Sequence, residues 1–119
     1  MRHAESNIQK QCVRWFRTQY PHYAKLLFAV GNGGARSKIE AAIMIGEGVT
    51  PGVADLIFLK ANDEYSALCI EMKSAKGSLT KSQKEWRDIV GLHGSRYVIC
   101  RDVYEFKVVI DSYIKNKKI

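Results

Sequence analysis

The sequence predicts an α/β fold, in which a central mixed sheet of four strands is flanked by helices. Helical and strand-like apolar patterns alternate in the order αβ(α)ββαβα, and a sheet covered by helices is the usual layered solution for such an order. Glycine, proline and polar residues separate the segments. The length of 119 residues suits one domain, which we expect to span 1–119.

An apolar stripe at helical spacing predicts a first helix from about residue 4 to residue 20. A proline follows directly and marks the end of this helix. The apolar run from Lys25 to Val30 then predicts the first strand. The residues of the stripe are Ile8, Cys12, Trp15 and Phe16.

A second helix is expected from Arg36 to Ile45, after a turn rich in glycine. Its apolar residues recur at helical spacing, so we expect them to face the rest of the domain. They are Ile39, Ala42, Ile43 and Gly46.

Two strands follow, from Asp55 to Leu59 and from Ala67 to Lys73. The polar turn Asn62-Asp63-Glu64 lies between them and predicts a hairpin.

The last part of the chain predicts a helix, a strand and a closing helix. Thr80 and Gln83 have the spacing of a capping box, which opens a helix through about Leu92. Residues 96–100 (RYVIC) form the fourth predicted strand. Asp102 can cap a final helix from about 103 to 115, whose apolar stripe consists of Phe106, Val109, Ile110 and Tyr113.

The charge balance favours a polyanionic partner. Nineteen Lys and Arg against twelve Asp and Glu give a net charge of +7, and neutralising phosphates releases condensed counterions. The cysteines at 12, 69 and 100 lie in apolar stretches without metal-ligand spacing, so we expect buried free thiols in a reducing compartment. No apolar run has the length of a membrane span. We therefore expect a cytoplasmic protein with no membrane partner.

The most informative feature is an acid at the start of one predicted strand and Glu-x-Lys at the end of the next. Side chains alternate across a strand, so Glu71 and Lys73 should share one sheet face. Together with Asp55 they would gather two acids and a lysine, a set suited to a hard divalent cation. Phosphodiester cleavage assisted by a metal is the chemistry that this favours.

The same residues have structural alternatives. Asp55 could be a simple turn residue, and Lys73 could form a salt bridge to Glu71. A second Glu-x-Lys, at 105–107, lies in a helical pattern with no preceding strand-borne aspartate.

This arrangement resembles the PD-(D/E)xK nuclease superfamily. More narrowly, the segment from Gly48 to Leu56 resembles the glycine-rich approach to the acidic strand in virus-type replication-repair nuclease (VRR-NUC) domains, including stand-alone phage and bacterial members. The similarity runs from about Glu5 to Asp102 and implies a restriction-endonuclease-like core. It departs at Ala54, where the family usually has proline. The other residues that carry it are Gln9, Asn32, Gly33, Gly34, Arg36, Glu71, Met72, Lys73, Gly77, Ser78, Leu79, Thr80 and Gln83.

The resemblance implies roles for individual residues. Asp55 and Glu71 would bind Mg²⁺ or Mn²⁺ through carboxylate oxygens, with the Met72 carbonyl as a further ligand. Lys73 would orient or activate the attacking water. Glu5 would complete the metal sphere, although an acid in a first helical turn is also favourable by itself. Gln83 would act near the reacting phosphate, although the capping box can use the same side chain.

A second group of residues is expected to contact DNA. The backbone near Asn32 and the guanidinium of Arg36 could bind phosphate, although a plain turn with a surface arginine explains them too. A basic edge beside Glu71 would contact the DNA backbone, although such charges are often only solvated. This edge consists of Lys76, Lys81, Lys84 and Arg87.

The resemblance also implies an activity. Stand-alone relatives of this size suggest an endonuclease that resolves Holliday (four-way) junctions as a homodimer, and they include enzymes encoded by phages. A less selective nickase, a flap nuclease, an RNA-directed nuclease and a catalytically silent DNA-binding adaptor are the alternatives.

Overall fold

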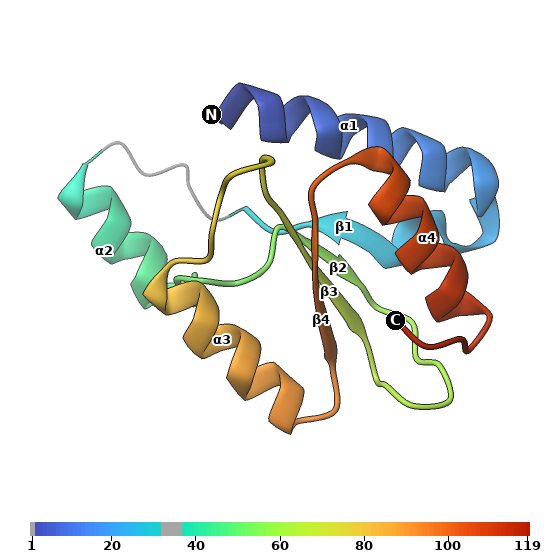
Figure 1. Ribbon diagram of the computed structural model, residues 1–119. Coiled ribbons are helices and arrows are strands. Elements are labelled where there is room, and N and C mark those ends of the chain that lie inside the picture. Colours follow the sequence, from blue (N-terminus) through green and yellow to red (C-terminus); the bar gives the residue numbers. More distant parts are fainter. Residues whose placement is uncertain (1, 32–36) are drawn as a thin grey trace.

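The computed structural model describes residues 2–31 and 37–119, and its elements follow the predicted order (Figure 1). This confirms the α/β class with a mixed four-stranded sheet. The helices are α1 (Arg2–Gln19), α2 (Lys38–Gly46), α3 (Lys81–Leu92) and α4 (Val103–Ile114), with a 3₁₀ helix η1 (Pro21–Leu26). The strands are β1 (Leu27–Ala29), β2 (Leu56–Phe58), β3 (Leu68–Met72) and β4 (Arg96–Cys100).

The four strands form one sheet in the order β1-β2-β3-β4. The first two pairings are antiparallel, with Leu56 opposite Ala29 on one side and Ile70 on the other. The β3–β4 pairing is parallel, with Cys69 opposite Tyr97. A parallel pair needs a long crossover connection, and α3 supplies it. The predicted hairpin between β2 and β3 is also present, closed by the Asn62 side chain, which accepts hydrogen bonds from the N–H groups of Glu64 and Tyr65.

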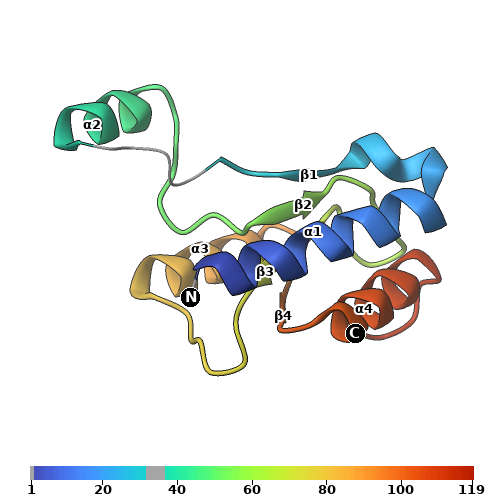
Figure 2. The same cartoon turned by 90° about the horizontal axis from the view of Figure 1, so that it is seen from above.

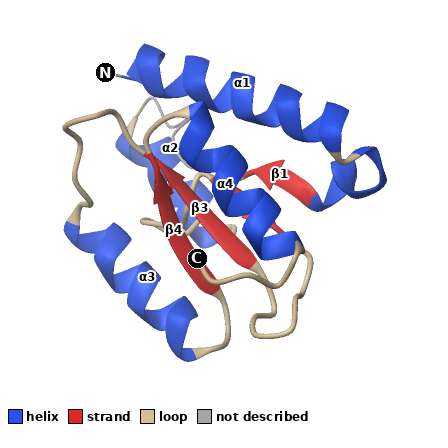
Figure 3. Cartoon of the chain, turned by 45° about the vertical axis from the view of Figure 1, so that its right-hand side comes forward, coloured by secondary structure: helices blue, strands red, loops and turns tan. Residues whose placement is uncertain are grey.

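Helices cover both faces of the sheet (Figure 3). On one face α1 and α4 enclose the larger apolar core, to which they contribute Cys12, Phe16, Phe106, Ile110 and Tyr113. On the other face Trp86 and Val90 of α3 pack against Ala54, Cys69 and Tyr97. Since both faces are covered, all five residues of β3 are buried. The acidic end of this strand therefore lies inside the domain.

The first strand begins later than the sequence predicts. Lys25 and Leu26 belong to η1, and β1 contains three residues only. Pro21 has the fixed φ that suits the first turn of a helix, so it starts η1 in addition to following α1. The N–H of Tyr23 donates to the Tyr20 carbonyl at 3.0 Å. The local 3₁₀ turn therefore includes Lys25 and Leu26, which the apolar pattern alone assigns to the strand.

The prediction that the apolar side of α2 packs on the domain is wrong. No residue of α2 is buried, and none belongs to either apolar core. Ile39 is 75% exposed and Ile43 is 56% exposed. Figure 2 shows α2 standing apart from α1, α3 and the sheet. Helical spacing identifies an apolar face, but it does not say what that face covers.

The three cysteines are free and buried, as predicted. Burial raises the pKa of the Cys12 thiol to about 12 and that of the Cys69 thiol to about 11, because water no longer solvates the thiolate. These thiols are packing groups and remain protonated. None of the described helices has the combined length and apolar character that crossing a bilayer requires.

We expect Gly52→Ala to destabilise the fold by about 2–4 kcal/mol. Gly52 has φ +87°, and an added Cβ would lie 2.3 Å from the Ser82 carbonyl oxygen at the start of α3. Gly48→Ala is the matched control, since Gly48 has φ +106° but nothing within 4 Å of an added Cβ. The control should lose only about 1–2 kcal/mol, from backbone strain. Urea unfolding measures the free energy of unfolding of both variants. Equal losses would show that the close approach of Gly52 to α3 does not contribute to stability.

Candidate active site

Two neighbouring strands bring Asp55 and Glu71 together at the same end of the sheet. Leu56 pairs with Ile70 in the antiparallel register, so Asp55 comes beside Glu71 at the next position. The Met72 N–H donates to Asp55 Oδ2 at 2.8 Å, which fixes the aspartate against β3. Asp55 precedes β2 directly and is not a free turn residue. Its carboxylate is anchored by the strand that carries the second acid.

Glu71 is a buried carboxylate with one satisfied oxygen. Its side chain is only 4% exposed. Gln83 Nε2 donates to Oε2 at 3.2 Å, and the Lys73 ammonium lies 3.7 Å from the same oxygen. Oε1 is buried and has no hydrogen-bond partner among the described residues. A buried oxygen of this kind is costly unless a proton or a cation neutralises it.

The surroundings of Glu71 raise its pKa to about 8. Burial is the main cause, because the charged form is poorly solvated. The negative charge of the neighbouring Asp55 raises the pKa further, and Glu5 adds a smaller repulsion. Lys73 acts in the opposite direction. One ammonium is therefore not enough to neutralise this group of acids.

Lys73 lies on the same side as Glu71, as alternation predicts. The 3.7 Å contact is the salt bridge that the sequence left as an alternative role. The Lys73 N–H donates to the Cys100 carbonyl at 3.1 Å, which continues the β3–β4 pairing past the end of β3. The backbone thus holds the lysine in place while its ammonium stays next to the acids. By contrast, the second Glu-x-Lys lies within α4, where Phe106 is part of the core.

The Gln83 side chain takes part in the capping box of α3 and also reaches the Glu71 carboxylate. Its Oε1 accepts the Thr80 N–H at 2.9 Å, and its backbone N–H donates to Thr80 Oγ1 at 3.3 Å, which completes the capping box. Its Nε2 donates to Glu71 at the same time. Because the amide has separate donor and acceptor atoms, one side chain can cap α3 and orient the carboxylate.

Glu5 on α1 faces the acidic end of β3. Its Oε2 accepts the Ser74 N–H at 3.3 Å, where the chain leaves β3 and passes beside the start of α1 (Figure 1). Glu5 also lines a small polar cavity of about 70 Å³ together with Ser6, Gln9, Asp55 and Met72. Gln9 is four residues after Glu5, so both side chains point to this cavity from one helix face. Glu5 therefore contributes to the site.

The residues of this site fit a divalent cation. The described part of the chain has no ready cluster of three or more His, Cys, Asp or Glu side chains. Mg²⁺ needs fewer protein ligands, because it keeps several waters. Asp55 and Glu71 could hold such an ion through carboxylate oxygens, including the buried Oε1 that lacks a partner. The Met72 carbonyl could join them, because the N–H of the same residue already points to Asp55. Glu5 is placed to bind through water.

The predicted DNA contacts are only partly described. Asn32 and Arg36 lie outside the described residues. Lys81 and Lys84 are exposed in the first turn of α3, next to Gln83, and Lys76 is exposed in the loop after β3.

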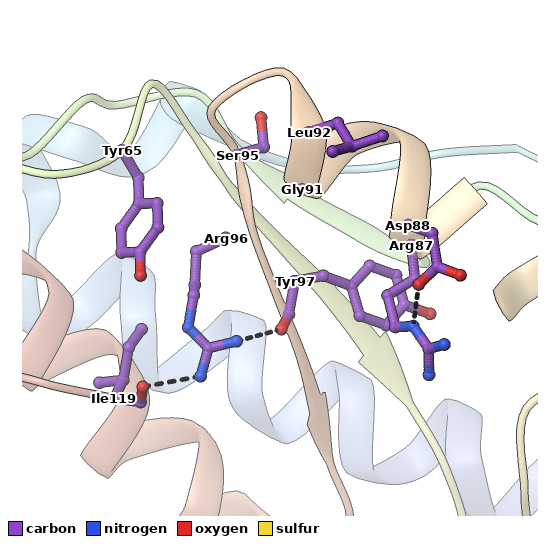
Figure 4. Close-up of a pocket in the computed structure, with 9 residues that line it drawn as sticks. All are labelled: Tyr65, Arg87, Asp88, Gly91, Leu92, Ser95, Arg96, Tyr97 and Ile119. Carbon is purple, nitrogen blue, oxygen red and sulfur yellow. Dashed lines mark hydrogen bonds and ion pairs between the residues drawn. The ribbon is translucent and has the colours of Figure 1, made fainter. Parts of the chain in front are cut away.

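Arg87 lies further along α3 than the other predicted contacts. Its Nε donates to Asp88 at 2.9 Å, in a groove of about 690 Å³ over the start of β4 (Figure 4). An acidic neighbour lowers its value as a phosphate contact. The part of the basic edge that is open to DNA therefore lies in the loop before α3 and in the first turn of that helix.

Two residues near the site are not predicted from the sequence: Tyr97 in β4 and Arg101, which directly follows β4. Arg101 donates to the carbonyls of Ser74 at 2.7 Å and Gly77 at 2.8 Å, and so holds the loop that follows Lys73. The hydroxyl of Tyr97 is buried without a partner among the described residues. Burial raises the pKa of Tyr97, and the charge of Glu71 adds to this effect. Figure 4 shows the Tyr97 ring pointing to the α3 side of the strand. No local motif marks either residue, because the segments that surround them are distant in the chain.

In the metal-free protein we expect Glu71→Gln to raise the melting temperature at pH 8. The folded wild type holds the Glu71 proton up to about pH 8, whereas the unfolded chain releases it near 4.5. Wild-type stability therefore falls as pH rises through this window, and a neutral amide removes that loss. The gain at pH 8 should be about 1–3 kcal/mol and should vanish at pH 4.

Thermal unfolding in EDTA at both pH values measures this difference. Mg²⁺ should stabilise the wild type and have little effect on the variant. A variant that is less stable than the wild type at pH 8 would contradict the electrostatic account.

Comparison with known proteins agrees with this geometry. The family model described as the VRR-NUC domain matches residues 3–103. A solved structure described as a VRR_NUC domain protein is similar at 25% sequence identity with a TM-score of 0.83, over 97% of this chain and 91% of that chain. No curated protein matches. Since the matched residues include both acids, Lys73 and Gln83, the chain belongs to the VRR-NUC family of nucleases.

Proposed function

We propose that this nuclease is a metal-dependent DNA endonuclease that hydrolyses phosphodiester bonds at the Asp55–Glu71 site. One observation carries the proposal. The Glu71 carboxylate is buried beside Asp55 and keeps an oxygen with no hydrogen-bond partner in residues 2–31 and 37–119, while the Lys73 ammonium lies beside the other oxygen. A purely structural role would not require two acids in such costly proximity. A divalent cation, Mg²⁺ or Mn²⁺, removes that cost and brings hydrolytic chemistry with it.

Each residue has a distinct role in the proposed reaction. Bound Mg²⁺ or Mn²⁺ supplies positive charge against the reacting phosphate. Asp55, Glu71 and the Met72 carbonyl would hold it, and the Gln83 amide keeps the Glu71 carboxylate in one orientation. The Lys73 ammonium orients the attacking water in line with the scissile bond and offsets charge that develops on the phosphate. The departing 3′ oxygen leaves without a covalent enzyme intermediate.

The charge of the domain supports a nucleic-acid substrate. The chain carries +7 overall, and exposed Lys76, Lys81 and Lys84 adjoin the acidic site through the β3–α3 loop and the start of α3. Such lysines contact the phosphate backbone and do not read bases. Affinity should therefore depend on DNA shape and salt more than on sequence.

The proposed substrate is branched DNA, a four-way junction cut by a homodimer. One site in a small domain can make paired cuts across a two-fold junction only with a second copy. A nickase or flap nuclease is the alternative that uses the same chemistry on other substrates. We disfavour a silent adaptor, because Asp55, Glu71 and Lys73 are all present and lie close together.

A gel assay on labelled DNAs tests the proposal. The substrates are a four-way junction, a 5′ flap, a single strand and a plain duplex, each in Mg²⁺ or Mn²⁺. Paired symmetric cuts confined to the junction are expected. Cutting of every branched form would reject the junction specificity but keep the nuclease, and tight binding without cleavage would favour the adaptor.

Asp55→Asn should lower the cleavage rate by at least about 100-fold, because it weakens the metal site. Junction binding in Ca²⁺ should stay within about twofold of wild type. Asp63→Asn is the matched control, an exposed turn aspartate far from the site in the fold, and should cleave normally. Normal cleavage by the Asp55 variant would refute the site.

Lys73→Ala should reduce the turnover number by about 100-fold and change DNA affinity little, since its ammonium acts on the reacting groups. Lys107→Ala is the control, because Lys107 occupies the corresponding position in the second Glu-x-Lys. Single-turnover cleavage and a binding titration separate the two effects. A loss confined to binding would contradict the catalytic role.

A further inference from the structure

The outer edge of β4 is not covered by another strand in the described part of the chain. The sheet order is β1-β2-β3-β4, so β4 is paired on one side only (Figure 3). The Arg96 N–H donates to the Ala67 carbonyl at 3.0 Å, and the even-numbered residues of β4 therefore direct their backbone groups to β3. Those of Tyr97 and Ile99 point the other way, to the outer edge.

The backbone groups on this outer edge are largely open. The Tyr97 carbonyl already accepts Arg96 Nη1 at 2.6 Å. The Tyr97 N–H and both backbone groups of Ile99 have no hydrogen-bond partner among the described residues. Unpaired donors and acceptors along a strand edge are a template for one more polypeptide strand.

A continuous groove follows the outer edge of β4 between α3 and α4. Its first part, of about 690 Å³, lies over the start of β4, and its middle part, of about 410 Å³, shares Arg87, Arg96 and Tyr97 with the first. The last part, of about 380 Å³, shares Ile99 and Val108 with the middle. An extended segment in this groove would therefore lie along the open backbone groups.

The two walls of the groove differ in chemistry. On the α3 side, the Arg87 side chain is 41% exposed, and Figure 4 shows its guanidinium bonded to Asp88 through one nitrogen only. On the α4 side, Tyr104 and Val108 are 74% and 44% exposed. The side chains of an extended segment point alternately to the two sides. The groove therefore matches a segment in which acidic and apolar residues alternate.

The charge of the groove favours an acidic occupant. Among the described residues, the middle part is lined by Arg87, Arg96 and Lys118 and by no acid. The acids near the two ends are already engaged, since Asp88 accepts Arg87 Nε at 2.9 Å and Glu105 accepts the backbone N–H of the residue after β4 at 2.7 Å. An occupant with carboxylates therefore supplies the charge that the groove lacks.

Two other occupants fit the groove less well. A second copy would bring the same cations to the edge, so pairing β4 with β4 is opposed by repulsion. The phosphates of DNA match the cations, but they are acceptors only and leave the Ile99 carbonyl without a donor. A polypeptide strand offers both donors and acceptors.

We propose that the outer edge of β4 binds an extended segment of a partner protein, with alternating acidic and apolar residues, as an added antiparallel strand. In this orientation the residue opposite Ile99 exchanges both backbone hydrogen bonds with it, whereas a parallel strand needs the Tyr97 carbonyl that Arg96 already occupies. Tyr97 and Ile99 face α3, and directly opposed side chains share a face, so the residues opposite these two are the acidic ones. The inference goes beyond the proposed nuclease activity and does not rest on it.

A labelled peptide of about eight residues that alternates glutamate and valine tests the proposal by fluorescence anisotropy with the wild-type protein. It should bind with a dissociation constant on the order of 10–100 µM. The same peptide with lysine in place of glutamate should bind at least about tenfold more weakly. Equal binding of the two peptides would overturn the proposal.

Methylation of the peptide backbone tests the orientation without changing the protein. Methyl groups on the glutamate nitrogens remove the donors that face β4, and should weaken binding at least about tenfold. Methyl groups on the valine nitrogens point away from β4 and should change binding by less than about threefold. Equal losses from the two methylations would contradict the added strand.

Ile99→Pro tests the same contact from the side of the protein. Proline removes an N–H that points to the outer edge, so the pairing with β3 should remain. Ile99→Ala is the matched control, because it shortens the side chain but keeps the N–H. The proline variant should bind the glutamate peptide at least about tenfold more weakly than the alanine variant, with thermal unfolding as the check on the fold of both. Equal affinities of two folded variants would overturn the proposal.

Amide hydrogen exchange of the wild-type protein identifies the occupant of the edge. With the glutamate peptide in excess, exchange of the Ile99 amide should slow at least about tenfold, while that of Val98, which already faces β3, should not change. An Ile99 amide that stays unprotected would overturn the proposal. Protection that rises with protein concentration alone would assign the edge to a second copy, and protection by a single-stranded oligonucleotide but not by the peptide would assign it to DNA. Either result would overturn the proposal too, and none of these measurements depends on cleavage.

Discussion

The hydrogen bond between Gln83 and Glu71 joins the parts of the structure that make the site. It connects the start of α3 to the acidic end of β3, and the same glutamine caps the helix. The buried carboxylate needs a donor, and the helix N-terminus needs an acceptor. One side chain meets both needs, so the position of the crossover helix and the orientation of the acid are coupled. A shift of α3 would remove the hydrogen bond that the Gln83 amide donates to the Glu71 carboxylate.

The surrounding chain is arranged to keep that coupling rigid. Gly52 passes so close to the Ser82 carbonyl that no larger residue fits, and Asp55 follows three residues later. Arg101 holds the loop between Lys73 and α3 by its carbonyl groups, and Glu5 takes the Ser74 N–H from the other side. Each contact joins segments that are far apart in sequence. The site is therefore a property of the whole domain and not of one motif.

Charge is distributed in opposite ways at the centre and at the surface. At the centre, burial and then repulsion from Asp55 raise the pKa of Glu71 to about 8, while the chain as a whole is strongly basic. Such a domain attracts a polyanion over its surface and a cation at its centre. The half-buried Lys73 only partly offsets the charge of the nearby carboxylates. The nuclease family and this electrostatic pattern agree.

The sequence by itself determined the order of elements, the strand alternation that puts Glu71 and Lys73 together, and the family. The order of elements and the alternation follow from the local spacing of apolar residues. The family follows from the combination of Asp55 with Glu71-x-Lys73 and the residues around them. It could not place the start of β1, where a proline turn overrides apolar character, or decide between the two roles of Gln83. It was wrong about α2, because an apolar stripe looks the same whether it covers its own domain or is exposed. Only the tertiary structure decided which residues are buried, that one Glu71 oxygen has no hydrogen-bond partner among the described residues, and that Arg101 binds the loop after β3. Each of these depends on contacts between segments that are distant in the sequence.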